Sequence, residues 1–198
     1  KDYEEYKKED IGNVVLVPTE YEGIGAVRSY IVNVWAADKD HVVMMDDDIE
    51  MVKNLHGGEV NVKDFFKEFF SKLEEENLYF GGVPLCTNTF FMKDEWSTKL
   101  KYISGAIQFV RIDKSRAVID CRYRHYEDFV YDILYFKRDG IAGEMGGMDK
   151  RLDNEKIADE IIDRFGNKCV SKYWKKLGRG PAGFNLKLNW RTKPENIL

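Results

Sequence analysis

Three consecutive carboxylates, Asp46, Asp47 and Asp48, follow an apolar run at residues 42–45. The run predicts a buried strand, and side chains alternate along an extended chain, so Asp46 and Asp48 can share one side. Two converging carboxylates repel each other unless a cation neutralises them. Carboxylate oxygens suit Mg²⁺ or Mn²⁺, and Mg²⁺ characteristically uses one or two carboxylates together with substrate phosphates. We therefore expect Asp46 and Asp48 to bind a metal ion and Asp46 and Asp47 to contact a nucleotide diphosphate, the alternative being a solvated acidic turn.

A glycine pair, Gly23 and Gly25, lies upstream of the triplet and is followed by Arg28 in the first turn of a predicted helix. Glycines let the backbone come close to a ligand, and an arginine at this place can reach a diphosphate or stack on a base. The stretch lacks the third glycine of the dinucleotide-binding fingerprint. We interpret Gly23, Gly25 and Arg28 as candidate nucleotide contacts, with a helix cap and a surface arginine as the alternative.

Glu127 and Asp128 open another predicted helix. Acidic side chains are common in a first helical turn because they interact favourably with the helix dipole. The same placement could direct one carboxylate into the site as a general base that activates an acceptor hydroxyl. The residues alone favour the capping role, and the neighbouring His125 is interpreted as structural.

Strands and helices that alternate along the chain must position these residues. Apolar or alternating runs predict strands at residues 14–17, 42–45, 79–92, 106–112 and 184–190. Helical periodicity predicts helices at 22–36, 62–73, 127–136 and 154–165, the first burying Ala26, Tyr30, Ile31, Val34 and Trp35 and the second a phenylalanine-rich stripe. This alternation predicts one α/β domain over residues 1–198, with a mostly parallel central sheet and flanking helices. In such sheets ligands bind beyond the carboxyl ends of strands, where the Asp triplet falls.

The charge of the chain is unevenly distributed. Residues 168–198 contain eight Lys or Arg and one acid, a balance of +7, so the net charge of −4 leaves −11 for the rest. The aromatic residues interleaved with this basic segment are Tyr173, Trp174, Phe184 and Trp190. The segment could hold a phosphate backbone and stack on bases, although its aromatics could equally belong to the core and the overall pI of about 5.5 is unfavourable for a polyanionic ligand.

The cysteines and the hydropathy of the sequence indicate in which cellular compartment the protein is expected. Cys86, Cys121 and Cys169 are scattered, without the spacing of a disulfide framework or a zinc site, which favours buried thiols in a reducing cytoplasm. The start "KDYEEYKKED" is charged and unlike a signal peptide. No apolar run is long enough to span a membrane, so we expect no membrane partner.

The motifs together resemble those of a known family. The stretch "GIGAVRSYIVNVWAADKDHVVMMDDD" resembles the core of GT-A glycosyltransferases, and "YEDFVYDILYFKRDG" resembles their later Glu-Asp motif at the head of a helix. The longer stretch "VVLVPTEYEGIGAVRSYIV…VVMMDDDI" is most similar to the TET-associated glycosyltransferases of phages and protists, the group that includes base J glucosyltransferase. Relatives of that group attach sugars to hydroxymethylated pyrimidines in DNA, and the resemblance covers roughly residues 1–145.

The resemblance implies a GT-A-like, Rossmann-like fold and transfer of a sugar from a nucleotide-sugar, with UDP-glucose favoured, to a hydroxyl acceptor such as hydroxymethylcytosine in DNA. Carried over, Asp46 and Asp48 would bind Mn²⁺ or Mg²⁺ and the donor, Arg28 and the loop of Gly23 and Gly25 would lie along the nucleotide, and Glu127 or Asp128 would serve the acceptor hydroxyl. The implied location is the cytoplasm, that of a bacterial host if a bacteriophage encodes the chain.

Two departures from the family pattern keep other functions open. The family normally begins with a strand and a nucleotide-binding loop, so here the first strand is expected to be missing or permuted. No histidine follows His125, although many members have a late metal-binding histidine. The alternatives are a non-catalytic GT-A-like binding domain and a nucleotidyltransferase, which also requires paired carboxylates and Mg²⁺.

Overall fold

A computed structural model describes residues 2–8, 13–53, 58–83, 96–123, 125–140, 142–144, 155–175 and 183–197. Its centre is a five-stranded sheet in the order β1-β4-β2-β5-β3. The strands are β1 (His41–Met45), β2 (Phe80–Gly82), β3 (Trp96–Ser97), β4 (Ile107–Arg111) and β5 (Ala142–Glu144). A separate two-stranded sheet pairs β6 (Val170–Lys175) with β7 (Gly183–Leu188).

The expectation of a mostly parallel sheet is wrong. The pairs β1–β4, β4–β2 and β3–β5 are antiparallel, and β2–β5 is parallel. β1 and β2 run in the same direction, as the strand-helix-strand pattern predicts, but β4 inserts between them in the opposite direction. The pattern along the chain therefore indicated the mixture of strands and helices but not the order in which the strands pair.

The three helices that begin at Val62, Glu127 and Glu155 agree closely with the periodicity of the sequence. The helices are α1 (Asp2–Tyr6), α2 (Ile24–Tyr30), α3 (Val62–Glu75), α4 (Glu127–Asp139) and α5 (Glu155–Phe165), with a short 3₁₀ helix, η3 (Pro194–Asn196). Gly140 and Gly166 follow α4 and α5 with φ of 79° and 81°, positive values that glycine adopts more easily than other residues. In the described part of the chain, no helix has both the length and the apolar character needed to cross a membrane.

Three of the predicted strands differ from the structure in presence, burial or extent. Residues 13–18 form no strand, and Val15 and Leu16 are exposed, so the buried strand expected at 14–17 is wrong. The run at 42–45 does form a strand, but β1 lies at the sheet edge and only Met44 within it is buried. Of the strand expected at 79–92, Phe80–Gly82 is present, and residues 84–92 lie outside the described ranges. The sequence patterns also did not predict β3, β5 or β6.

Helix α2 continues directly into a π-helix, η1 (Ile31–Trp35), instead of remaining one α-helix. The N–H of Ala36 donates to the carbonyl of Ile31 at 2.9 Å, a bond that spans five residues. The wider turn rotates the following side chains away from the α-helical face. Val34 and Trp35 are consequently 57% and 55% exposed, so the prediction that they share the buried face of this helix is wrong.

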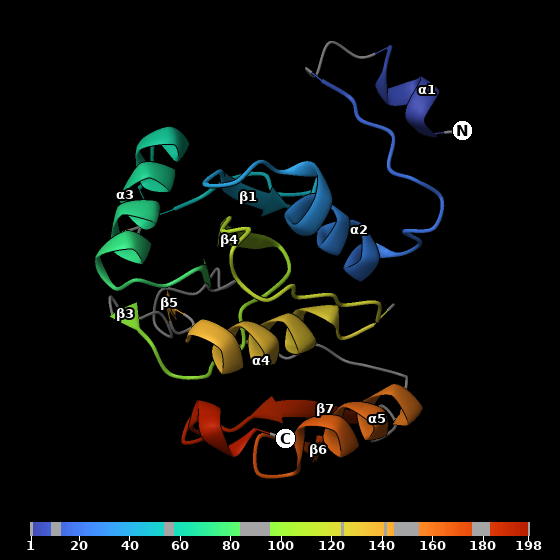
Figure 1. The fold of residues 1–198 in the computed structure, drawn as a ribbon, viewed down its shortest axis with the longest axis vertical. Helices are drawn as coiled ribbons and strands as arrows, with labels where there is room; N and C mark the ends of the chain where they lie inside the picture. Colours follow the sequence, from blue (N-terminus) through green and yellow to red (C-terminus); the bar gives the residue numbers. More distant parts are fainter. Residues whose placement is uncertain are drawn as a thin grey trace.

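Helices cover both faces of the central sheet (Figure 1). On one face Phe69 of α3 stacks on Phe109 of β4, with ring centroids 3.9 Å apart. On the other face Tyr135 of α4 stacks on Phe80 of β2 at 4.4 Å, and this core continues into α5 and the β6–β7 hairpin. Val42 and Met44 of β1 pack against the core that contains α4, whereas Val43 packs against the cluster that contains α3. The two faces of β1 therefore contact different apolar clusters.

Candidate functional site

Arg28 of α2 joins three segments that are far apart in the sequence. Its Nη2 donates to the Gly105 carbonyl at 2.6 Å and to Asp46 Oδ1 at 3.3 Å, and its Nη1 donates to Glu127 Oε1 at 3.4 Å. The arginine is only 4% exposed. The structure therefore brings together the glycine-helix motif, the acidic strand end and the acidic helix head, and the alternative of a surface arginine is wrong.

The two glycines before Arg28 have different roles. Gly23 precedes α2 with φ of 92°, a conformation that favours glycine, and it is exposed. Gly25 is buried, and a Cβ at that position would lie 2.6 Å from the Tyr123 carbonyl oxygen and 3.0 Å from Glu127 Cβ. The close approach at Gly25 is thus to protein backbone and to the head of α4. The missing side chain allows α2 to come close enough for Arg28 to reach Glu127.

The acidic triplet lies at the end of β1. The Asp46 N–H donates to the Ala106 carbonyl at 2.9 Å, which extends the ladder by one residue, and Asp47 and Asp48 form the following turn. All three aspartates are exposed, and the side chain of Asp46 is 44% exposed even though it pairs with Arg28. The predicted position at a carboxyl strand end is confirmed, while the strand itself lies at the edge of the sheet.

Glu127 and Asp128 begin α4 and face different partners. Glu127 meets Arg28, whereas an oxygen of Asp128 accepts a 2.5 Å hydrogen bond from the Tyr102 hydroxyl. Asp128 is 1% exposed and also accepts from the Phe129 N–H at 2.9 Å. Burial, followed by the neighbouring Asp128 carboxylate, raises the pKa of the Tyr102 phenol, so the phenol stays protonated and donates. Asp128 therefore anchors the loop before β4, and Glu127 faces the acidic strand end.

The loop at residues 102–105 contacts the cluster around Arg28, and none of its residues was among the candidates predicted from the sequence. Gly105 accepts from Arg28, Tyr102 donates to Asp128, and Asp132, one helical turn after Asp128, accepts from the Ile103 N–H at 2.9 Å. A signal for the loop was present, because a Ser-Gly pair before an apolar run marks a turn. Asp132 was also visible as a second acid on the same helical face as Asp128.

The capacity of the site for a metal ion rests on Asp46 and Asp48. Among the described residues, no group of three or more His, Cys, Asp or Glu side chains lies close enough to hold a metal ion. Two carboxylates nevertheless match the way in which Mg²⁺ is bound, when a substrate phosphate supplies further oxygens and water completes the shell. Carboxylate oxygens are the donor type that such a cation takes, and one of these carboxylates, Asp46, already pairs with Arg28.

The basic C-terminal segment is described in part. Trp190 is 47% exposed and lies between two cations, with Lys99 Nζ 5.0 Å and Arg191 Cζ 4.8 Å from its ring centroid. The hydroxyl of Thr192 donates to the Lys168 carbonyl at 2.9 Å, which places the Lys168 backbone beside the same turn. The side chains at 173–175 and 184, and residues 176–182 altogether, lie outside the described part. Trp190 thus belongs to the surface and not to the core.

Two of the cysteines are described, and the thiol of one of them, Cys121, donates to the backbone carbonyl of Glu127 at 3.7 Å. Cys121 and Cys169 are buried free thiols, as expected, and burial raises their pKa values to about 12 and about 11. Cys86 lies outside the described ranges, and His125 is exposed.

The chain matches no protein-family model, no curated protein and no solved structure.

Proposed function

We propose that the protein is a metal-dependent glycosyltransferase that moves a sugar from a nucleotide-sugar, with UDP-glucose as the favoured donor, to a hydroxyl acceptor. The observation that carries the proposal is the position of Arg28 between Asp46 and Glu127. Three motifs selected for their chemistry, separated by up to 99 residues, meet at one guanidinium. An acidic turn and an unrelated helix cap would have no reason to share that contact.

Each residue of the cluster has a distinct role in this proposal. Asp46 and Asp48 hold the divalent cation, which when bound neutralises the negative charge that develops on the leaving diphosphate. Arg28 holds the Glu127 carboxylate toward the strand end, where Glu127 accepts the proton of the acceptor hydroxyl. Asp128 and Tyr102 position the loop that supplies the Gly105 carbonyl to Arg28. The roles of Glu127 and Asp128 are thereby separated, one reacting and one positioning.

For the acceptor we propose a hydroxymethylated pyrimidine in DNA. This part rests on the resemblance to the TET-associated glycosyltransferases and on the exposed Trp190 between Lys99 and Arg191. An exposed indole can stack on a base while nearby cations contact phosphates. A base inside a duplex cannot reach the acidic strand end, so it must be flipped out or supplied in single-stranded DNA.

The test measures binding of UDP with and without Mn²⁺, followed by transfer of labelled glucose from UDP-glucose to DNA that contains hydroxymethylcytosine or hydroxymethyluracil. We expect Asp48→Asn to weaken Mn²⁺-dependent UDP binding at least about tenfold, about 1.4 kcal/mol. Because Asp48 is exposed in a turn, the melting temperature should not change. Asp163→Asn, at an exposed position on α5, is the matched control and should bind like the wild type.

The same assay identifies the alternatives by their products. Absence of any Mn²⁺-dependent UDP binding in the wild type would contradict the enzyme and favour a non-catalytic domain. Release of pyrophosphate in place of UDP would indicate a nucleotidyltransferase. Transfer to a small-molecule or protein hydroxyl, but to neither modified DNA, would retain the glycosyltransferase and contradict the DNA acceptor.

A further inference from the structure

On the outer edge of β1, three alternate residues present backbone groups that have no partner in the described part of the chain. The ladder to β4 uses even-numbered residues: the Ile112 N–H donates to the Asp40 carbonyl, and the Asp46 N–H donates to the Ala106 carbonyl, both at 2.9 Å. In an antiparallel ladder the intervening residues direct their N–H and C=O groups the other way. The odd-numbered residues His41, Val43 and Met45 therefore present these groups at the edge, and no group in the described part of the chain hydrogen-bonds to them.

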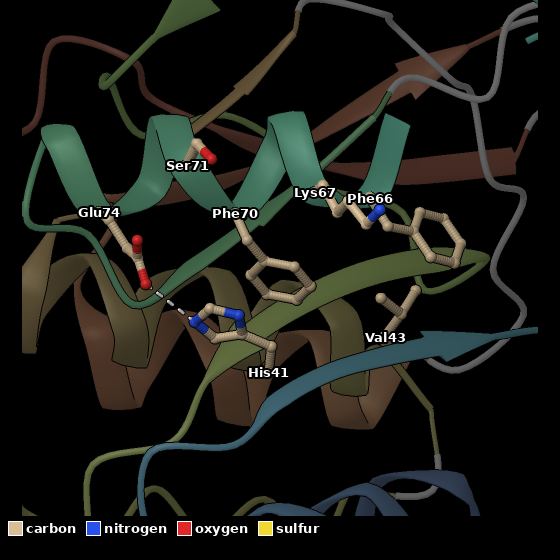
Figure 2. A pocket seen from close by; sticks show the side chains of 7 residues that line it. All are labelled: His41, Val43, Phe66, Lys67, Phe70, Ser71 and Glu74. Atoms are coloured by element: carbon tan, nitrogen blue, oxygen red, sulfur yellow. Dashed lines mark ion pairs between the residues drawn. The ribbon is translucent and has the colours of Figure 1, made fainter. Parts of the chain in front are cut away.

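A groove of about 590 Å³ lies beside this edge, between β1 and α3 (Figure 2). Its lining residues are His41 and Val43 from β1 and Phe66, Lys67, Phe70, Ser71 and Glu74 from α3. His41 stacks flat on Phe70 with centroids 4.3 Å apart, and its Nε2 lies 3.1 Å from Glu74 Oε1. Figure 2 shows Val43, Phe66 and Phe70 on an apolar stretch of the groove, with Lys67, Ser71 and Glu74 along the helix. The groove thus combines apolar contact area with an open row of backbone donors and acceptors.

Carboxylates bracket the edge at both ends. Residues 38–50 contain six acids and one lysine, a balance of −5, with two acids before the strand and four after it. The single lysine, Lys39, is already paired with Asp113 at 3.0 Å. A ligand that lies along β1 therefore meets negative charge on either side of an apolar centre.

We propose that β1 and α3 form a docking site for an extended basic peptide of a partner protein, which adds to the sheet as a sixth strand. Backbone hydrogen bonds to His41, Val43 and Met45 provide affinity, as in other complexes formed by strand addition. Alternate apolar side chains of the peptide enter the groove, and Lys or Arg at its ends meet the flanking acids. Pairing with a second copy is disfavoured, because a two-fold axis at Val43 would place Asp46 opposite Asp40 of the other copy.

The groove and the open strand edge are separate from the proposed glycosyltransferase centre, and the two sites share only the acids that follow β1. Asp46 turns toward Arg28 on the α2 and α4 side of β1, whereas His41 and Val43 face α3 on the opposite side. Asp48, the predicted metal ligand, does not line the groove. Glu127→Gln, which removes the proposed general base and none of the acids that flank β1, should consequently leave peptide binding within about twofold of the wild type, a difference under 0.5 kcal/mol.

The experiment measures fluorescence anisotropy of a labelled peptide, Lys-Arg-Val-Thr-Val-Thr-Val-Arg-Lys, with the full chain. We expect micromolar binding, and at least about tenfold weaker binding when glutamates replace the four basic residues. Backbone N-methylation of the peptide, one position at a time, should weaken binding about tenfold at alternate positions and little at the positions between, because only every second N–H faces β1. These probes leave the protein unchanged, so a folding defect cannot produce the pattern.

Two protein variants complete the test. Val43→Pro removes one outward N–H without removing a bond to β4, and proline is tolerated at such an edge position. It should weaken peptide binding about tenfold, while Val43→Thr, which keeps the N–H and the shape, should retain it. Equal losses at every N-methylated position, equal binding of the acidic peptide, or no binding of the basic peptide would each overturn the proposal. A dimer of the wild type that Val43→Pro dissociates would overturn it as well and assign the edge to a second copy.

Discussion

At the scale of single residues, Arg28 determines which of two adjacent acids faces the strand end. Consecutive residues in an α-helix point about 100° apart, so Glu127 and Asp128 cannot share a partner. Glu127 faces the guanidinium, and Asp128 faces Tyr102. The positions of Glu127 and Asp128 at the head of α4 therefore decide which partner each one faces. Both are carboxylates, so their chemical type alone would not distinguish them.

The burial of this cluster predicts unequal effects of neutralising Arg28 and Asp46. The Arg28 and Glu127 side chains are 5% and 10% exposed, whereas that of Asp46 is 44% exposed. We expect Arg28→Met to lower the free energy of unfolding by about 3 kcal/mol, because it leaves a buried carboxylate without its cation. Asp46→Asn should lower it by less than about 1 kcal/mol, because water already screens that pair.

Urea denaturation of the single and double variants measures these differences. The double variant Arg28→Met, Glu127→Gln should recover part of the loss, since the uncompensated charge is then removed. No recovery, or equal effects of Asp46→Asn and Arg28→Met, would show that the cluster is not held together by the buried Arg28–Glu127 pair.

At the scale of elements, α3 combines a strong cap with a one-sided aromatic face. The Asn61 side chain accepts from the N–H groups of Lys63 at 3.0 Å and Asp64 at 3.3 Å, which satisfies two of the free donors at the helix start. Phe69, Phe70 and Leu73 are buried, and Phe65 and Phe66 are partly buried. The cap determines where the helix begins, and the aromatic face determines which side meets the sheet.

The cap gives a prediction local to this helix. Asn61→Ala should lower the free energy of unfolding by about 1 kcal/mol, since the exposed Asn61 contributes through these bonds and not through packing. Asn61→Asp, which keeps an acceptor and adds a favourable charge at the helix start, should retain the stability. Thermal melts of the three proteins check this, and an aspartate variant as unstable as the alanine variant would contradict it.

At the scale of the whole molecule, the central sheet separates two apolar clusters of unequal size. The larger cluster joins the sheet to α4, α5 and the β6–β7 hairpin, and the smaller one holds α3. Phe109 of β4 is fully buried at the centre of the smaller cluster and contacts the rings of Phe65, Phe66, Phe69 and Phe70. The attachment of α3, and with it the proposed peptide groove, depends on this strand.

We therefore expect Phe109→Ala to lower the free energy of unfolding by about 3–5 kcal/mol, through lost burial and the cavity that remains. Val118→Ala, at a position 72% exposed, is the control and should change stability by no more than about 0.5 kcal/mol. Urea denaturation measures both, and a loss below about 1 kcal/mol for Phe109→Ala would mean that α3 does not pack on β4 as described.

The local chemistry of the chain was sufficient to predict α3, α4, α5 and the acidic strand end. The phenylalanine spacing predicted α3, the glycines at 140 and 166 marked where α4 and α5 end, and the apolar run before Asp46 predicted a strand. Helix periodicity, caps and turn residues act over a few neighbouring positions, so one sequence contains them in full.

Strand pairing and burial were decided by tertiary contacts. β4 lies between β1 and β2, which made the sheet mostly antiparallel and left β1 at its edge. Residues 14–17 resemble a strand but have no partner strand in the described part of the chain. Arg28 looked like a surface residue until α2, the end of β1 and the head of α4 met around it. Such outcomes depend on which distant segments bury surface together, and that choice is made by the whole chain, not by any one stretch of it.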